Sequence, residues 1–84
     1  MDDHQQKLKR RNSQISMVIG HNIRSLRRAQ KISLDQLSTV LEISYQQLQK
    51  YETGKNQIPA DKLFILKHYF NTPYETFFDP IEPP

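Results

Sequence analysis

The strongest constraint in this sequence is the spacing of its helix start signals. A hydroxyl residue is followed three positions later by Gln or Glu at Ser33–Gln36, Ser44–Gln47 and Thr72–Glu75. In such a capping box the hydroxyl accepts a hydrogen bond from the third amide of the helix, and the Gln or Glu side chain accepts from the amide of the cap residue. The first two starts are so close that only a short helix fits between them. The chain is therefore expected to form short helices joined by tight turns.

Apolar side chains recur at helical spacing through most of the chain, which indicates amphipathic helices. The expected inward faces carry Ile15, Ile19, Ile23 and Leu26; Leu34, Leu37 and Leu41; Leu48 and Tyr51; Leu63, Leu66 and Phe70; and Phe77 with Phe78. Gly54 is placed to end the third helix in the left-handed conformation. No alternating strand pattern occurs. The sequence predicts a compact all-α fold of five helices.

Composition divides the 84 residues into three parts. Residues 1–14 contain one aliphatic side chain after the initial Met, too little to offset the entropy of ordering, so we expect a flexible, disordered basic arm. Residues 15–79 hold the helices and form one domain. Residues 80–84 form a Pro-rich tail that cannot continue a helix. A domain this small has no room for a deep substrate cleft.

The charge distribution is uneven although the net charge is only +3. Eight basic and no acidic residues lie between Lys7 and Lys31, whereas the last fourteen residues carry three acids and no base. This asymmetry indicates an anionic partner that is met from one side, or a solvated helix face beside a polar arm. On charge alone, the solvated face is the simpler interpretation.

Catalytic chemistry finds little support in the sequence. The three histidines (His4, His21 and His68) lack metal-ligand spacing, and there is no cysteine to join them. The two glycines, Gly20 and Gly54, are too far apart to build a phosphate-binding loop. We expect no enzyme activity, no catalytic residue, no metal site and no cofactor.

Hydropathy argues for a protein that stays in the compartment where it is made. No segment approaches the roughly 18 apolar residues that span a membrane. No hydrophobic run of signal-peptide length follows the N-terminal bases. We therefore expect a cytoplasmic protein.

The segments 34–41 and 45–53 are separated only by Glu42, Ile43 and Ser44. Two short helices joined by about three residues must cross steeply, as in a helix-turn-helix motif, here at about residues 34–53. The run Ile19-Gly20-His21-Asn22-Ile23-Arg24-Ser25-Leu26-Arg27 resembles the opening helix of the Cro and phage-repressor (Xre-type) family. The resemblance continues at Leu37, Ile43, Ser44, the Tyr51-Glu52-Thr53-Gly54 run, Pro59, Leu63 and Phe70. It covers about residues 15–78.

This resemblance implies a sequence-specific, double-stranded DNA-binding transcriptional regulator, a repressor, whose helix 45–53 enters the major groove. The implied base-reading residues are Ser44, Tyr45, Gln46, Gln49 and Lys50. Gln pairs well with adenine and Lys with guanine, which suits this role. The alternative is that the glutamines are only good formers of a solvated helix.

The resemblance also implies contacts to the DNA backbone, which need only donors near the duplex. The implied phosphate-binding residues are Arg24, Arg28, Ser33, Thr53, Lys55, Asn56 and Gln57, with Lys7, Lys9, Arg10 and Arg11 of the arm as further candidates. Arg27 and Glu52 are expected to form a partly buried, structural ion pair.

Three positions depart from the family pattern. Leu34 stands where a glutamine commonly contacts phosphate, so that contact must be lost or replaced. Glu42 stands where the turn usually has glycine, and a positive φ there costs about 1 kcal/mol. Lys67 replaces a small core-facing residue, and its stem is expected to extend past Leu63.

Partners remain open between two alternatives. The resemblance implies a homodimer on a palindromic operator, with half-sites about one helical turn apart. Antitoxins and restriction–modification controller proteins share the compact layout, so the main partner is alternatively another protein, such as a toxin, in a protein that regulates its own operon. Aromatic residues of the C-terminal segment close the core, form a dimer seam or bind such a partner; they are Tyr74, Phe77 and Phe78, followed by Ile81.

Overall fold

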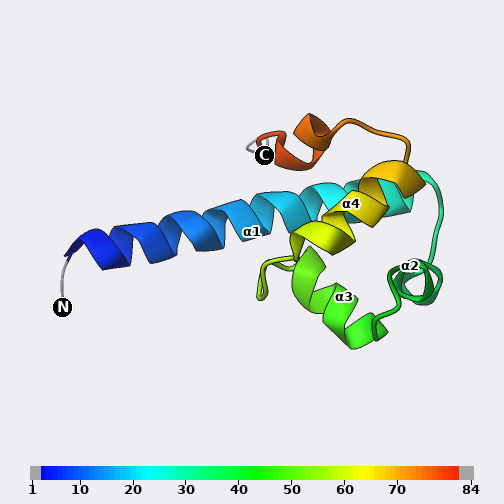
Figure 1. The fold of residues 1–84 in the computed structure, drawn as a ribbon, viewed down its shortest axis with the longest axis horizontal. Helices are drawn as coiled ribbons and strands as arrows, with labels where there is room; N and C mark the ends of the chain where they lie inside the picture. Colours follow the sequence, from blue (N-terminus) through cyan, green and yellow to red (C-terminus); the bar gives the residue numbers. More distant parts are fainter. Residues whose placement is uncertain (1–2, 82–84) are drawn as a thin grey trace.

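A computed structural model describes the backbone of residues 3–81 and the side chains of residues 14–81. Its elements are α1 (Asp3–Ala29), α2 (Leu34–Leu41), α3 (Tyr45–Glu52), α4 (Ala60–Tyr69) and the 3₁₀ helix η1 (Tyr74–Phe78), arranged as in Figure 1. The described residues contain no strand, in agreement with the all-α prediction. The expected count of five helices is wrong, because four α-helices are followed by a single 3₁₀ segment. None of the described helices is long and apolar enough to cross a bilayer.

The three predicted capping boxes form to different extents. At Ser33 the box is complete: Oγ accepts from the Gln36 amide at 3.0 Å, and Gln36 Oε1 accepts from the Ser33 amide at 2.8 Å. Ser44 Oγ accepts from the Gln47 amide at 3.1 Å, but the Gln47 side chain bonds elsewhere. The box predicted at Thr72 does not form, because its hydroxyl bonds the Thr76 hydroxyl at 3.0 Å. The chain after Thr72 therefore lacks a side-chain cap and makes only a short 3₁₀ turn.

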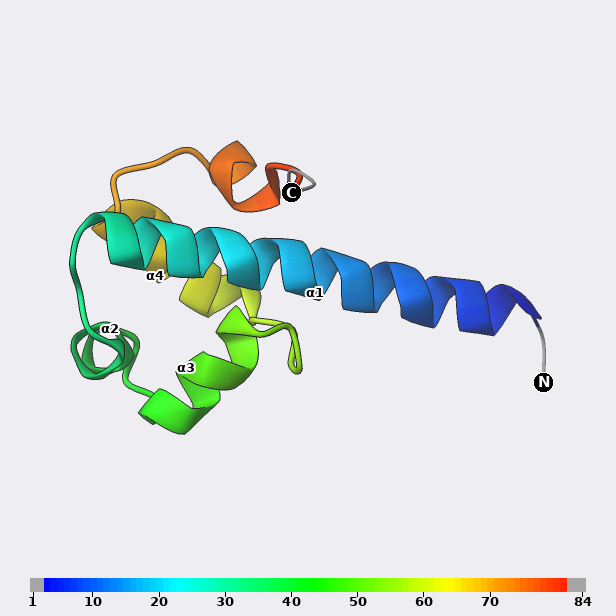
Figure 2. The ribbon, with the colours of Figure 1, turned by 180° about the vertical axis from the view of Figure 1, so that it is seen from behind.

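The N-terminal segment differs from the predicted flexible arm. The backbone is helical from Asp3 onward and continues without a break into the rest of α1. Residues 3–14 contain neither Gly nor Pro and are rich in Gln, Lys and Arg, which are good helix formers, so nothing ends the helix before the core is reached. In both views the first half of α1 projects beyond the other helices (Figures 1 and 2). The side chains of Lys7, Lys9, Arg10 and Arg11 lie outside the described side chains.

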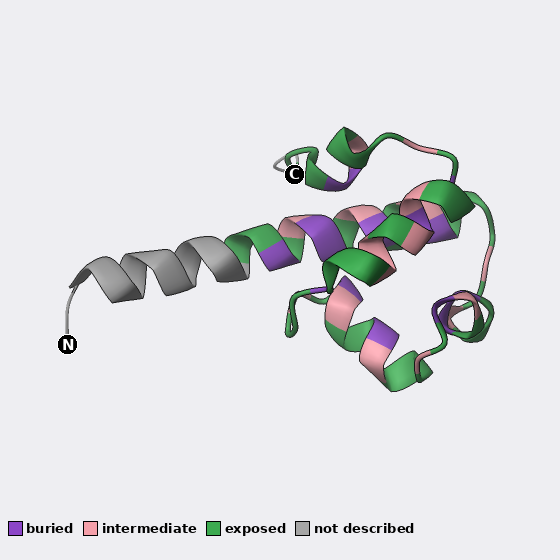
Figure 3. Cartoon of the chain, viewed as in Figure 1, coloured by how far each residue is buried: buried purple, intermediate pink, exposed green. Residues whose placement is uncertain are grey.

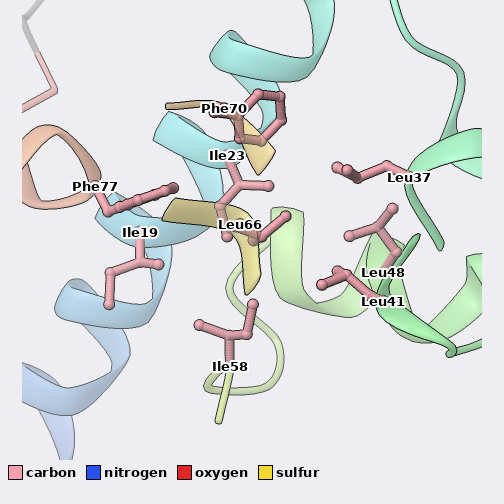
Figure 4. Packing of buried hydrophobic residues seen from close by; sticks show 9 residues of the cluster. All are labelled: Ile19, Ile23, Leu37, Leu41, Leu48, Ile58, Leu66, Phe70 and Phe77. Atoms are coloured by element: carbon pink, nitrogen blue, oxygen red, sulfur yellow. The ribbon is translucent and has the colours of Figure 1, made fainter. Parts of the chain in front are cut away.

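All helices contribute to one hydrophobic core (Figure 3). Nine buried side chains converge in Figure 4; they are Ile19, Ile23, Leu37, Leu41, Leu48, Ile58, Leu66, Phe70 and Phe77. Leu26, Leu34, Tyr51 and Leu63 pack against this cluster and are half-buried. The predicted inward faces are confirmed except at Ile15 and Phe78, which are 44% and 49% exposed. Both lie at the edge of the region that the other elements cover.

The C-terminal segment is fastened to α1 by one side chain. Asn22 Nδ2 lies 2.9 Å from the carbonyl oxygens of both Phe77 and Asp79, to which it donates. η1 packs along α1 (Figure 2). The Phe77 ring is fully buried. The Asn22 amide thus satisfies carbonyls that a short 3₁₀ helix leaves without partners.

The turn between α2 and α3 keeps a strained backbone conformation. Glu42 ends α2 with φ 57° and ψ 42°, in the left-handed region that favours glycine. The Ile43 amide donates to Ser38 O at 3.0 Å, and Lys62 Nζ donates to Leu41 O at 2.9 Å. These bonds satisfy the last carbonyls of α2 and hold the turn, although Glu42 is not the residue best suited to it.

Replacing Glu42 with glycine is therefore expected to stabilise the protein. Glu42→Gly should raise the free energy of unfolding by about 1 kcal/mol, because it removes the left-handed penalty at an exposed position. Urea denaturation measures this change. Glu42→Ala is the control, since alanine keeps the penalty and should show no comparable gain. A lower stability of the glycine variant would contradict this account of the turn.

Candidate nucleic-acid interface

α3 presents two chemically different faces. Leu48 is fully buried and Glu52 is 7% exposed, so this side of the helix faces the core. The residues predicted to read bases are all exposed; they are Ser44, Tyr45, Gln46, Gln49 and Lys50. Ser44 is the N-cap and the other four lie on α3 itself. The side of α3 that faces away from the core is therefore polar and exposed to solvent.

A hollow of about 450 Å³ lies beside this exposed face, bounded by α1, α3 and the first residue of α2. It is lined by Arg24, Arg27, Leu34, Gln46, Gln49, Lys50, Glu52, Thr53 and Lys55. Three of the predicted base-reading residues thereby share one concave surface with three of the predicted phosphate-binding residues. The remaining predicted site residues do not line it; they are Ser44, Tyr45, Arg28, Ser33, Asn56 and Gln57, and all are exposed.

The rim of the hollow is positively charged. Among the described side chains, Arg24, Lys50 and Lys55 have no carboxylate within salt-bridge distance. Arg27 and Glu52 form an ion pair with each other, so they add no net charge to the hollow. The free cations come from α1, from α3 and from the loop after α3, and they can approach one anionic partner together.

Hydroxyl groups at the two ends of α3 are partly used by the helix itself. Ser44 Oγ accepts the Gln47 amide, while Thr53 Oγ1 donates to Gln49 O at 2.9 Å. Ser44 keeps its own proton for a further acceptor. The Thr53 proton is already used, so Thr53 is a weaker phosphate donor than its position in the sequence indicates.

The loop that follows α3 is held in place by a residue that sequence reasoning did not assign to the site. Gln47 Nε2 donates to Asn56 Oδ1 at 3.2 Å, and the backbone N–H of Asn56 donates to Lys50 O at 3.2 Å. Gly54 turns the chain with φ 78°. These contacts keep Lys55 beside the end of α3. The sequence had placed Gln47 only in a capping box, and no local pattern relates it to a partner nine positions away.

The predicted ion pair is confirmed, and it is well buried. Arg27 Nε lies 2.7 Å from Glu52 Oε2, and Nη2 lies 3.0 Å from Oε1, which makes a bidentate pair. Nη1 donates to Ile32 O at 2.9 Å. Arg27 and Glu52 are 9% and 7% exposed. The pair thus connects α1, the α1–α2 loop and α3 at the floor of the hollow.

Two departures from the family pattern have visible consequences. Leu34 is half-buried against the core and lines the hollow, so it offers no polar group where the pattern has a phosphate contact. The ammonium nitrogen Nζ of Lys67 lies 5.4 Å from the centre of the Tyr74 ring. This is within cation–π range and joins α4 to η1.

Comparison with known proteins agrees with this geometry. A sequence-family model described as helix-turn-helix matches residues 23–77, which contain the α2–turn–α3 unit and the core around it. The chain belongs to the Xre-type helix-turn-helix family.

The described part of this helix-turn-helix protein contains no group of three His, Asp or Glu side chains that could hold a metal ion.

Curated proteins similar to this family member carry names of transcriptional regulators. The chain is 37% identical over 68 residues to an uncharacterized HTH-type transcriptional regulator of Rickettsia prowazekii, covering 81% of this chain and 52% of that protein. It is 33% identical over 64 residues to an uncharacterized transcriptional regulator in the ATPase CF(0) region of Rhodospirillum rubrum, covering 76% of this chain and 59% of that protein. The chain thus spans about half the length of the curated relatives it matches.

Among solved structures, the fold is similar to that of the restriction-modification controller protein C.AhdI from Aeromonas hydrophila. The TM-score is 0.68 at 17% identity, and the match covers 75% of this chain and 96% of the controller protein. At this identity the likeness concerns the fold.

Removal of one partner of the buried ion pair is expected to destabilise the protein strongly. Arg27→Met should lower the free energy of unfolding by about 3–5 kcal/mol, because it leaves the Glu52 carboxylate buried without a counter-charge. The double variant Arg27→Met/Glu52→Met should recover most of this loss. Urea denaturation of both variants measures the two effects. A double variant no more stable than Arg27→Met would show that the unpaired carboxylate is not the cause.

Proposed function

We propose that this protein binds double-stranded DNA sequence-specifically and represses transcription, with α3 in the major groove. The observation that carries the proposal is the exposed polar face of α3, which includes Lys50 and is flanked by Arg24 and Lys55. None of these three cations has a carboxylate partner among the described side chains. An α-helix fits the major groove, and cations beside it neutralise phosphates on its edges. Family membership and the names of the relatives support the same function.

The site residues divide into two roles. Gln46, Gln49 and Lys50 lie on the exposed face of α3 and carry the donors and acceptors that distinguish adenine and guanine in the major groove. Tyr45 and Ser44 read bases at the start of the helix. The surrounding donors position the domain on the backbone; they are Arg24, Arg28, Ser33, Lys55, Asn56 and Gln57, with Thr53 in a lesser role.

One domain of this size reads only a short stretch of DNA through α3. A homodimer on a palindromic operator would double the contact area, and it would act in the cytoplasm where the DNA lies.

Three exposed apolar side chains of the C-terminal segment support a protein contact: Tyr74, Phe78 and Ile81 are 37%, 49% and 43% exposed. A second protein, such as a toxin bound by an antitoxin or controller-type regulator, is the alternative occupant of this surface, and size analysis with and without DNA distinguishes the two.

Binding to DNA should depend steeply on salt. Random-oligonucleotide selection first supplies an operator, and its affinity is then measured by fluorescence anisotropy at several salt concentrations. The logarithm of the binding constant should fall by roughly 0.9 per phosphate contacted for each tenfold rise in salt. A binding constant that does not change with salt would contradict the proposed interface.

Variants of the two residue classes should have different effects. Gln46→Ala should cost roughly 1–3 kcal/mol on the selected operator and relax its preference at one base pair. Lys55→Gln should weaken binding to every duplex alike. The dependence of the logarithm of the binding constant on the logarithm of the salt concentration should become shallower by roughly 0.9, the amount for one phosphate contact. Anisotropy titrations on the operator and on a scrambled duplex separate the two results. An unchanged preference in Gln46→Ala would show that Gln46 does not read a base.

A further inference from the structure

Gly20 marks a close approach of the α1 and α3 backbones. It is a buried residue in the middle of α1. A Cβ atom at this position would lie 2.7 Å from the carbonyl oxygen of Glu52 and 2.8 Å from its carbonyl carbon, and closer still to the carbonyl oxygen of Tyr51. These are backbone atoms, which cannot rotate away as a side chain can. The end of α3 therefore rests directly on the backbone of α1.

The same residue of α3 is held at a second place on α1. The Glu52 side chain pairs with Arg27, whereas its carbonyl group lies against Gly20. Gly20 and Arg27 are seven residues apart, which is about two helical turns and roughly 10 Å along one side of α1. Contacts at two separated points determine both the distance of α3 from α1 and its tilt.

We infer that Gly20 is a positioning residue for DNA readout. Because it has no side chain, α3 sits deep against α1, and this depth sets where Gln46, Gln49 and Lys50 meet the base edges. The inference rests on the proposed function. Hydrogen bonds to bases require placement within about half an ångström, whereas long basic side chains reach phosphates from a range of positions. A shift of α3 should therefore reduce sequence preference more than general affinity for DNA.

The helix itself gives no reason for glycine at this position. Glycine is a poorer helix former than alanine, so Gly→Ala in an unobstructed helix raises the Tm of a domain this size by roughly 4–8 °C. At Gly20 the added methyl group meets the two carbonyl groups of α3 instead. We expect Gly20→Ala to lower the Tm and to move α3 outward.

The experiment compares Gly20→Ala with Ile23→Val in the full chain. Ile23 is fully buried, one turn along α1, and its truncation weakens the core without placing an atom against α3. Affinity is measured for the selected operator and for a scrambled duplex, and the readout is the ratio of the two. In Gly20→Ala we expect this ratio to fall at least about tenfold while affinity for the scrambled duplex changes little, because no charge is altered. In Ile23→Val the ratio should be that of the unaltered protein.

Loss of stability alone is separated from repositioning by this ratio. A smaller folded fraction lowers the apparent affinity for both duplexes equally, so the ratio of the two affinities does not change. All titrations are made in trimethylamine N-oxide, which favours the folded state, with the helix content of each variant checked by circular dichroism.

Three outcomes would overturn the inference. They are an unchanged ratio, a raised Tm, and a variant that stays unfolded in the osmolyte, since the last would assign Gly20 to folding as a whole. Failure of the proposed function is a different result, in which the unaltered protein selects no operator from random oligonucleotides. The role of Gly20 is tested only through variants of a protein that does select one.

Discussion

The contact between α1 and the end of α3 is the interaction on which the rest of the structure depends. An isolated helix of eight residues is not stable in water, so α3 owes both its existence and its direction to what it packs against. The Arg27–Glu52 pair supplies a directional contact of this kind, and Ile32 O accepts from a further guanidinium nitrogen. A buried charge pair is costly to desolvate, and good geometry with full hydrogen bonding offsets much of that cost. Its contribution is to specify one arrangement of three chain segments.

Stability and the candidate site are coupled because they use opposite faces of the same short helix. Leu48 and Glu52 hold α3 to the core, whereas Gln46, Gln49 and Lys50 are exposed on its other side. The turn before α3 is equally constrained, since backbone bonds hold Glu42 in a left-handed conformation and Lys62 of α4 donates to the Leu41 carbonyl at the end of α2. The strained conformation of Glu42 persists because the surrounding hydrogen bonds fix the backbone on both sides of it.

Particular residues show how far the sequence could predict the fold and the site. The capping box at Ser33 involves groups three residues apart, and it forms as predicted. The box at Thr72 had the same signal, but the hydroxyl of Thr76 was a competing partner. The first residues of α1 were expected to be flexible because they bury little, yet their helix-forming composition lets them extend an existing helix. Gln47 was assigned to its own helix and instead supports the loop that carries Lys55.

The sequence by itself determined the class of the fold, the inward faces of the helices and the polar surface of α3. These follow from periodicity and from groups only a few residues apart, for which the backbone geometry is nearly the same in every protein. The resemblance to a family added the pairing of Arg27 with Glu52. Only the tertiary structure decided how closely α3 approaches α1 at Gly20, where the Gln47 side chain bonds, and which cations surround one hollow. These depend on contacts between residues distant in the chain, and no local pattern encodes the distance between two backbones.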